Sequence, residues 1–321
     1  MTKSDLITIG IACYNAQDTI LRALESALEQ NWEHKEIVIV DDASNDNSVE
    51  TLEEFIKKHE NVKLIRHEKN KGPAATRQTI LENASGAFIA FFDDDDESLP
   101  ERLEKQHQRI VNYEEETGEH LIACYASGQR LYPNGYTLDL KAIGSEPSIP
   151  HGPKVADRLL FFGGDPDFFY GAGTPTCSLM ARKKTFEAIG GFDPDFRRVE
   201  DIDFAVRLAL TNGHFIGCPE QLFIQHATEA TDKAPEKNRD AELKLAEKHK
   251  EYLQSVNRYT YAKKWPLLRY HHFNKQYAHM ILILLELLLR HPLKTASHFL
   301  TTAPKRFLHE RKMKRKQTSC V

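Results

Sequence analysis

A run of five acidic residues, Asp93 to Glu97, follows directly on the apolar stretch FIAFF (residues 88–92). Two carboxylates held about 4 Å apart repel by roughly 4 kcal/mol at an effective dielectric near 20. A buried strand that ends here would point the alternate side chains Asp93 and Asp95 the same way. Converging carboxylates of this kind bind hard divalent cations such as Mg²⁺ or Mn²⁺. The run therefore predicts a cation site that meets substrate phosphates, and a solvated acidic loop is the alternative.

A second acidic segment, DDASND (residues 41–46), follows the β-branched run EIVIV. If that run is a parallel strand, Asp41 and Asp42 face a ligand beyond its carboxyl end and accept N–H hydrogens, for example from a nucleobase. The spacing from Asp42 to Glu53 also matches a calcium-binding EF-hand loop. That loop needs glycine where Asn47 stands and a helix where the β run precedes it, so a helix-capping role is favoured over calcium.

A third acidic cluster, Glu200, Asp201 and Asp203 in RRVEDIDFAVRLA, lies where a helix is predicted to begin. Negative charge at that end interacts favourably with the helix dipole, so capping is one interpretation. The other is a general base, a carboxylate aimed at the hydroxyl of an acceptor. The spacing of the three acids is compatible with both.

The elements that position these acids follow from an alternation in the first hundred residues. Short apolar, β-branched runs predict strands at 7–13, 36–40, 62–65 and 87–92, and the segments between them predict helices at 18–30, 47–58 and 74–84. This βαβαβαβ order indicates an α/β fold with a parallel sheet. Ligands of such sheets bind beyond the carboxyl ends of the strands, where the first two acidic segments fall.

Further along, the pattern predicts a hairpin, a long loop and more alternation. The hairpin lies at about 120–145 with a turn at PNG, and the glycine-rich stretch 161–176 is a loop of a length that is usually functional or mobile. The later elements are strands at 176–181 and 214–224 and helices at about 199–213 and 235–256.

The composition is that of a globular protein with an uneven distribution of charge. Of the 321 residues, 40% are apolar and 28% are charged, and the net charge is −4. From Arg290 to the end there are nine Lys/Arg and one acid, so this tail carries +8 and the rest carries −12. Apolar residues recur at helical spacing over 293–307, which favours an anionic membrane surface over nucleic acid as the partner of the tail. The run MILILLELLL (280–289) is shorter than the about 20 residues of a membrane span and predicts a buried or interfacial helix.

The cysteines and the N-terminus bear on cellular location. The five cysteines are scattered without a C-x-x-C pair, which favours a reducing cytosol over a disulfide framework or a zinc site. The first residues lack the long apolar core of a signal peptide. We therefore expect a cytoplasmic protein.

Three segments together resemble a known enzyme family. IACYNAQDTILRALESALEQNWEHKEIVIVDDASNDNS, NKGPAATRQTILENASGAFIAFFDDDDESLPERL and GGFDPDFRRVEDIDFAVRL are similar, in order and spacing, to the inverting glycosyltransferases of family 2. The likeness covers roughly residues 6–230. It implies the GT-A fold, which has a Rossmann-like, mostly parallel central sheet with flanking helices, followed here by a helical C-terminal extension with a basic tail.

The resemblance also implies roles for individual residues. The catalytic base would be Asp201, with Glu200 beside it, and Mn²⁺ or Mg²⁺ would be the cofactor. The metal ligands would be Asp93, Asp95 and His226, and the nucleotide sugar would be held by Ala12, Tyr14, Asn15, Asp42, Arg77, Asp93 and Asp94. Four consecutive aspartates replace the more usual D-S-D-D, so that Asp94 and Asp96 could shift the ligation by one.

We therefore expect a metal-dependent, inverting transfer from a nucleotide-diphosphate sugar, above all a UDP-sugar, to a glycan or lipid-linked acceptor in surface polysaccharide or glycoconjugate biosynthesis. The expected GT-A domain is 1–230, with a nucleotide-sugar half at about 1–118 and an acceptor half at about 119–230. The extension 231–321 would hold the enzyme peripherally on the inner face of the plasma membrane, without binding nucleic acid.

Two other functions compete with this interpretation. A sugar-1-phosphate nucleotidyltransferase would need a glycine-rich, arginine-containing loop after its first strand, and IACYNAQDT has none. A catalytically inactive, membrane-bound sugar-nucleotide binder is the other, and the intact Asp93, Asp95 and Asp201 argue against it.

Overall fold

The structure is a computed structural model that describes residues 5–227 and 234–302. It comprises two compact units, each with its own hydrophobic core. The first unit contains Met1–Leu131, Leu138–Ala156 and Gly164–His226, and the second contains Tyr132–Thr137, Asp157–Gly163 and the chain from Ala227 onward. The functional boundaries expected from the sequence, 1–230 and 231–321, stay a prediction.

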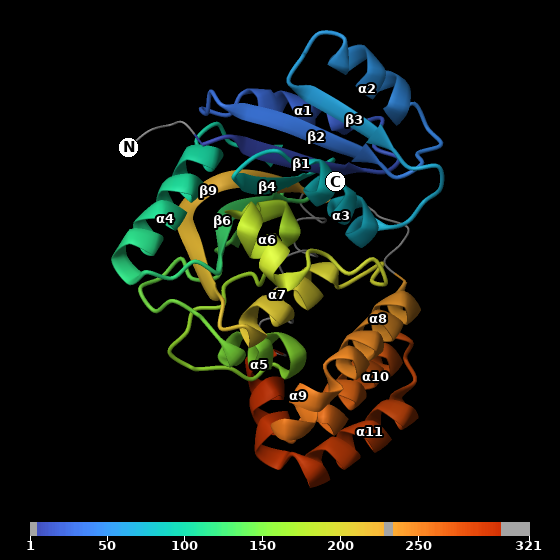
Figure 1. Ribbon diagram of the computed structural model, residues 1–321. Helices are drawn as coiled ribbons and strands as arrows, with labels where there is room; N and C mark the ends of the chain where they lie inside the picture. Colours follow the sequence, from blue (N-terminus) through green and yellow to red (C-terminus); the bar gives the residue numbers. More distant parts are fainter. Residues whose placement is uncertain (1–4, 228–233, 303–321) are drawn as a thin grey trace. The chain divides into compact units, whose positions relative to one another are not determined.

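The first unit opens with an alternation of strands and helices (Figure 1). The elements are β1 Ile7–Cys13, α1 Ile20–Leu28, β2 Lys35–Asp41, α2 Ser48–Ile56, β3 Val62–Arg66, α3 Pro73–Asn83 and β4 Phe88–Asp93. Nearly every residue of β1 and β4 is buried, as expected for strands that are covered on both faces. The predicted α/β fold is thereby confirmed.

The central sheet has the order β3-β2-β1-β4-β8-β6-β9-β5. Its later strands are β5 Glu97–Ser98, β6 Ile122–Leu131, β8 Leu179–Arg182 and β9 His214–His226, and β7 Thr137–Leu140 pairs with β6 as the predicted hairpin. The strands β1 to β4 pair in parallel, whereas β8 is antiparallel to both β4 and β6. The sheet is therefore parallel in its first half and mixed beyond it.

The register of the first strands determines where the acidic segments lie. Cys13 in β1 pairs with Asp41 in β2, and Ala12 pairs with Asp93 at the end of β4. The carboxyl ends of β1, β2 and β4 thus lie at one edge of the sheet. The loops that leave these strands meet there.

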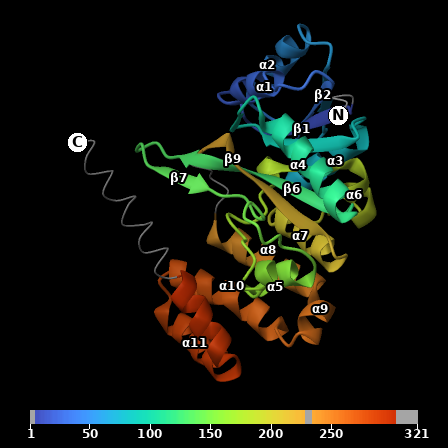
Figure 2. The same cartoon turned by 90° about the vertical axis from the view of Figure 1, so that its left-hand side faces the viewer.

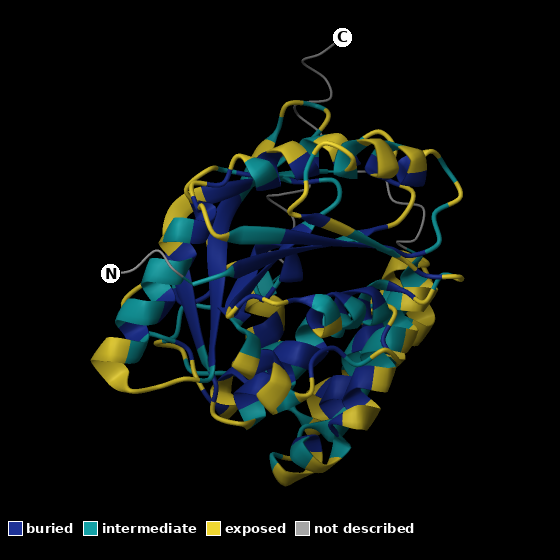
Figure 3. Ribbon diagram, turned by 45° about the horizontal axis from the view of Figure 1, so that its top comes forward, coloured by how far each residue is buried: buried dark blue, intermediate teal, exposed yellow. Residues whose placement is uncertain are grey.

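Helices flank this sheet, and Figure 3 shows its central strands buried and the outer sides of the helices exposed. The helices of the first unit are α4 Arg102–Thr117, α6 Lys183–Ile189 and α7 Glu200–Leu210, with a short 3₁₀ turn at Thr176–Ser178, whereas α5 Pro153–Phe161 begins in the first unit and ends in the second. No element had been predicted for the segments of α4 and α5. The buried Arg102 anchors α4, because its guanidinium donates to Ser98 Oγ and to the carbonyl oxygen of Phe91, both at 2.8 Å.

The second unit is mainly helical in its described residues (Figure 2). Its helices are α8 Pro235–Lys248, α9 Lys250–Ser255, α10 Tyr259–Phe273 and α11 Tyr277–Arg290, followed by a helical stretch over 292–302. Their core includes Leu253, Tyr261 and Leu287. The prediction of one helix over 235–256 is wrong, because His249 has a ψ of 25°, outside the helical range, and separates α8 from α9.

Within the described ranges, none of the helices combines the length and the apolar character that crossing a bilayer requires. The predicted amphipathic tail is described only as far as residue 302. Its basic segment, 303–321, lies outside the described residues.

Candidate functional site

Hydrogen bonds join the loops that follow β1, β2 and β4. The backbone N–H of Tyr14 donates to Asp94 Oδ2 at 2.9 Å, and that of Asn15 donates to Ser44 Oγ at 2.9 Å. Asn15 has a φ of 51°, a conformation that asparagine adopts more readily than most residues. Ala12 is half-buried, whereas Tyr14 and Asn15 are exposed. The backbone that was predicted to line the nucleotide pocket is therefore accessible between the two acidic loops.

Asp42 is buried and fixes the loop that precedes α3. Its Oδ1 accepts the backbone N–H of Lys71 at 2.8 Å, and its Oδ2 accepts that of Gly72 at 2.7 Å. His67 Nδ1 lies 2.7 Å from Asp42 Oδ1. Gly72 has a φ of 91°, at which any side chain would be strained, and it immediately precedes α3. Asp42 therefore positions the helix that carries Arg77.

We expect Asp42→Ala to weaken nucleotide binding and to destabilise the fold. The substitution leaves the backbone N–H groups of Lys71 and Gly72 without their acceptor, at a cost of about 1–3 kcal/mol for each group that stays buried. Calorimetric titration with UDP should give a lower affinity that still depends on a divalent cation, and thermal unfolding should give a lower midpoint. A variant that bound UDP as tightly as the parent would place the nucleobase elsewhere.

The acidic run leaves the sheet after its first aspartate. The strand β4 ends at Asp93, and Asp94 and Asp95 form a turn, so the expectation that Asp93 and Asp95 alternate along one strand is wrong. Asp96 is the buried member of the run. Its Oδ1 accepts the backbone N–H of His226 at 3.1 Å, and its Oδ2 is buried without a hydrogen-bond partner among the described residues.

One group of side chains in the described part of the chain is compact enough to hold a metal ion. Ligand atoms of Asp93, Asp96 and Cys177 lie within 4.8 Å of one another. The orphaned Oδ2 of Asp96 fits a cation, because buried carboxylate oxygens are otherwise hydrogen-bonded. The two carboxylates suit Mg²⁺ and Mn²⁺, and a sulfur ligand favours the softer Mn²⁺.

Asp95 and His226, which were predicted as metal ligands, do not belong to this group. The backbone oxygen of Asp95 accepts a hydrogen bond from the guanidinium of Arg22. His226 Nε2 lies 4.0 Å from Glu97 Oε2, and burial together with Arg22 lowers the pKa of His226. Their role in binding a metal therefore stays a prediction.

Electrostatic repulsion is concentrated in the acidic run. Burial raises the pKa of Asp96 to about 8, and the nearby Asp93 and Asp95 add to this effect. Burial also raises the pKa of Asp94 to about 8, although the N–H of Tyr14 opposes it. A positive charge at this edge of the sheet would relieve the repulsion.

Arg77 supplies one such charge and links the end of β4 to the start of α7. Its Nη2 donates to Asp93 Oδ1 at 3.2 Å, and its Nη1 donates to Glu200 Oε1. The side chain is only 10% exposed. Burial alone lowers the pKa of Arg77, but the carboxylates of Glu200, Asp93 and Asp201 raise it by more, so that the guanidinium stays charged.

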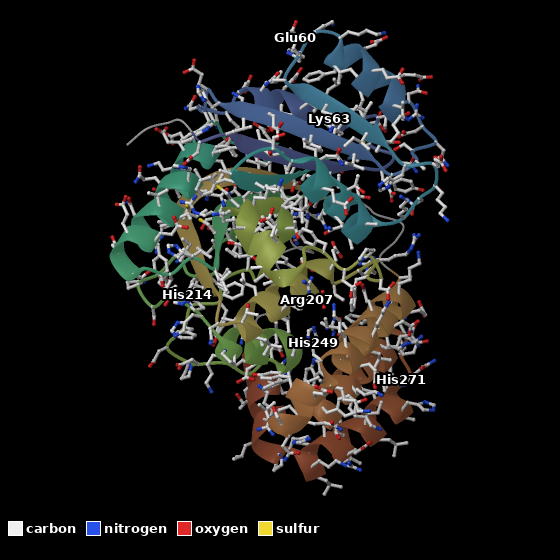
Figure 4. All side chains as sticks on the ribbon, viewed as in Figure 1. Glu60, Lys63, Arg207, His214, His249 and His271 are labelled. Carbon is white, nitrogen blue, oxygen red and sulfur yellow. The ribbon has the colours of Figure 1, made fainter. Side chains whose placement is uncertain are left out.

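The first turn of α7 holds three acids with different surroundings. Asp203 is fully buried and accepts a hydrogen bond from Arg207, labelled in Figure 4, at 2.8 Å, which makes its role structural. Glu200 is bound to Arg77. Burial, with the adjacent Glu200, raises the pKa of Asp201 to about 6. Asp201 is thus a stronger proton acceptor than an ordinary aspartate.

The residue before α7 has a strained backbone. Val199 has a φ of 59°, which is a genuine outlier for a β-branched side chain. Such strain concentrates at functional sites. It sets the direction in which α7 begins, and with it the position of Asp201.

Comparison with solved structures identifies the class of fold. The crystal structure of S. aureus TarS 1-349 in complex with UDP-GlcNAc matches with a TM-score of 0.61 and 18% sequence identity, over 91% of this chain and 83% of that chain. This likeness shows the fold, which is the GT-A arrangement that the sequence resemblance implied.

Comparison of sequences supports a glycosyltransferase. Residues 8–132 match the model of glycosyl transferase family 2. An uncharacterized glycosyltransferase of Haemophilus influenzae is 40% identical over 101 residues, which are 32% of this chain and 40% of the relative. The UDP-Glc:alpha-D-GlcNAc-diphosphoundecaprenol beta-1,3-glucosyltransferase WfgD of Escherichia coli is 33% identical over 138 residues, 40% of this chain and 54% of the relative. The chain thus spans about half the length of these relatives, or less.

Proposed function

We propose that this protein transfers a sugar from a nucleotide-diphosphate sugar to a hydroxyl of a glycan or lipid-linked acceptor, with inversion at the anomeric carbon. The observation that carries the proposal is the bridge made by Arg77 between Asp93 and Glu200. This bridge links the cluster of Asp93, Asp96 and Cys177, which is suited to binding a metal diphosphate, to the helix that carries Asp201. The pKa of the Asp201 carboxyl group is raised. UDP is the expected nucleotide, because it appears in the name of WfgD and in the TarS complex.

Each part of the site has a task in this reaction. Asp93 and Asp96, with Cys177 or Asp95, would hold Mn²⁺ or Mg²⁺, and that ion would offset the negative charge of the departing diphosphate. Asp201 accepts the proton of the acceptor hydroxyl as the hydroxyl attacks the anomeric carbon. The attack comes from the face opposite to the diphosphate, so the configuration inverts.

We expect UDP to bind tightly only when a divalent cation is present. Without the cation, the carboxylates of the acidic run repel the two phosphates. Calorimetric titration of the protein with UDP, with Mn²⁺ or Mg²⁺ and then with a chelator, measures the difference. Equal affinity under both conditions would remove the metal from the proposed function.

Matched variants then separate the two possible sets of ligands. Asp96→Asn and Asp95→Asn each replace a carboxyl group that could bind the ion by an amide of nearly the same volume. If Asp96 holds the ion, Asp96→Asn lowers the affinity for Mn²⁺, measured by electron paramagnetic resonance, more than Asp95→Asn does. The opposite order would restore the assignment of Asp95 made from the sequence.

We further propose that the acceptor is lipid-linked and that the protein works on the inner face of the plasma membrane, in surface polysaccharide or glycoconjugate assembly. The lipid-linked acceptor named for WfgD and the excess of basic residues after Arg290 support this. Screening nucleotide sugars for metal-dependent hydrolysis tests the donor. Release of pyrophosphate from UTP and a sugar 1-phosphate would instead favour a nucleotidyltransferase, and binding without hydrolysis would favour an inactive binder.

A further inference from the structure

The second unit presents a long apolar surface to solvent. Of the 13 large hydrophobic residues that are exposed in the described part of the chain, 10 lie between Phe273 and Leu300. Eight of them form the leucine stripe, which consists of Ile281, Leu282, Leu285, Leu288 and Leu289 on α11 and of Leu293, Phe299 and Leu300 on the helix over 292–302. Leu289 and Leu293 are 84% and 87% exposed. Exposed large apolar residues concentrated in one part of a protein in this way usually mark an interaction site.

The part of the leucine stripe on α11 is the outer side of a helix whose inner side already has partners. Leu287 is fully buried, and Met280, Ile283 and Leu284 pack against the helical core. The exposed positions of α11 recur at spacings of three and four residues, which keeps them on one side of the helix. The exposed residues of α11 therefore take no part in the helical core. The run predicted as a buried or interfacial helix is buried on one side and exposed on the other.

Positive charge accompanies the leucine stripe. The side chain of Arg290, at the end of α11, is 59% exposed. The 19 residues after Thr302 contain seven Lys/Arg and one acid. Exposed leucines that are followed in the sequence by a basic segment match the interface of an anionic bilayer, in which apolar side chains enter the acyl boundary and bases meet the headgroups.

Other occupants fit less well. A second copy of the chain carries the same excess of basic residues after Arg290 and would not neutralise it, whereas an anionic surface would. A nucleic acid would satisfy the bases but leave the leucines in water. With 14 residues, α11 is about 21 Å long, which is short of the about 30 Å hydrocarbon core, so this helix would lie along a membrane surface.

We propose that the leucine stripe inserts into the interfacial layer of an anionic lipid bilayer. The leucine stripe would then be the apolar surface through which the protein associates with the membrane, as the proposed function expects. Only the biological purpose of this membrane binding rests on the proposed function. The binding to lipid itself needs neither the sugar donor nor the acceptor.

The test is co-sedimentation of the full-length protein with vesicles of phosphatidylglycerol and phosphatidylcholine. The double variant Leu285→Glu/Leu289→Glu charges the leucine stripe without changing the core. We expect its partition onto vesicles to fall by about tenfold or more, because two apolar side chains no longer leave water. Leu21→Glu makes the same change at a side chain of α1 that is 45% exposed, and this control should sediment like the parent.

Equal sedimentation of the double variant and the parent would overturn the proposal. A second result would also overturn it. Light scattering would show that the parent is a dimer and that the double variant is a monomer, and neither protein would sediment with vesicles. The double variant should hydrolyse a nucleotide sugar in solution at the parental rate. A failure of membrane binding can therefore be distinguished from a failure of the proposed function.

Circular dichroism establishes that the variants fold. Should the double variant not fold, Leu289→Cys in a Cys320→Ser background can carry an environment-sensitive dye, since the described cysteines are all buried. Its emission should shift to the blue when anionic vesicles are added. Unshifted emission would overturn the proposal.

Discussion

Replacing Asp201 with asparagine should lower the turnover of sugar transfer by about 10²- to 10⁴-fold, or about 3 to 5 kcal/mol of activation free energy. Asparagine has nearly the same volume as aspartate but cannot accept the proton of the acceptor hydroxyl. The affinity for donor and metal should not change, because neither of the proposed donor and metal sites includes Asp201. The measurement is the turnover at saturating donor, with donor affinity determined separately by calorimetry.

Glu200→Gln is the matched control for this substitution. It changes the neighbouring carboxylate in the same way, but the Glu200 side chain is bound to Arg77 and its expected role is to orient the site. We therefore expect a smaller loss of turnover. If Glu200→Gln proved more damaging, or Asp201→Asn kept most of its turnover, Asp201 would not be the base.

The pH dependence of turnover provides a second readout of the same assignment. Burial and the adjacent Glu200 raise the pKa of Asp201 to about 6, so the carboxylate is protonated below that pH and available as a base above it. Parental turnover should fall about tenfold per pH unit below pH 6. The residual turnover of Asp201→Asn should lack this acidic limb.

The elements of the first hundred residues could be predicted because burial imposes a clear pattern on them. Each strand and helix predicted there lies within two residues of its observed bounds. The strands β1 and β4 are buried along nearly their whole length, which requires the continuous apolar runs that the sequence displays. Helix α10 has a proline inside it and no single apolar face, so its sequence gave no comparable signal.

The contacts within the site depend on tertiary structure that a local pattern does not contain. Four identical side chains in sequence do not indicate which of them is buried. Asp96 is drawn inward because Glu97 in β5 pairs with Ile224 in β9, and the backbone of His226 then reaches its carboxylate. Cys177 joins the acidic group from a 3₁₀ turn far along the chain, and a lone cysteine carries no signal of such a role.

The apolar run in α11 is a second case in which the local sequence pattern does not determine which side chains are buried. Nearly every residue from Met280 to Leu289 is apolar, so hydrophobicity alone does not distinguish the side that packs from the side that faces solvent. Only the position of the core, with Leu287 at its centre and Leu289 outside it, separates the two. The sequence could therefore predict a buried or interfacial helix but not which of its sides is exposed.

Arg77→Met should lower the free energy of unfolding by about 3 to 5 kcal/mol, because it leaves the carboxylates of Asp93 and Glu200, which are 29% and 12% exposed, without their shared cation. For a domain of this size the unfolding midpoint should fall by roughly 10 °C. Methionine fills most of the space of the arginine stem, so the loss reports chiefly on charge. Thermal unfolding followed by circular dichroism measures it.

Two comparisons attribute this loss to the bridge. Arg66→Met breaks the pair with Glu53, whose side chains are both about half exposed, and exposed pairs contribute about 1 kcal/mol or less, so its midpoint should barely move. The double variant Arg77→Met/Glu200→Gln removes one of the stranded carboxylates and should regain part of the loss. An Arg77→Met protein as stable as the Arg66→Met control would mean that Arg77 does not bind α7 to the end of β4. The placement of Asp201 beside the acidic run, on which the proposed function depends, would then need another cause.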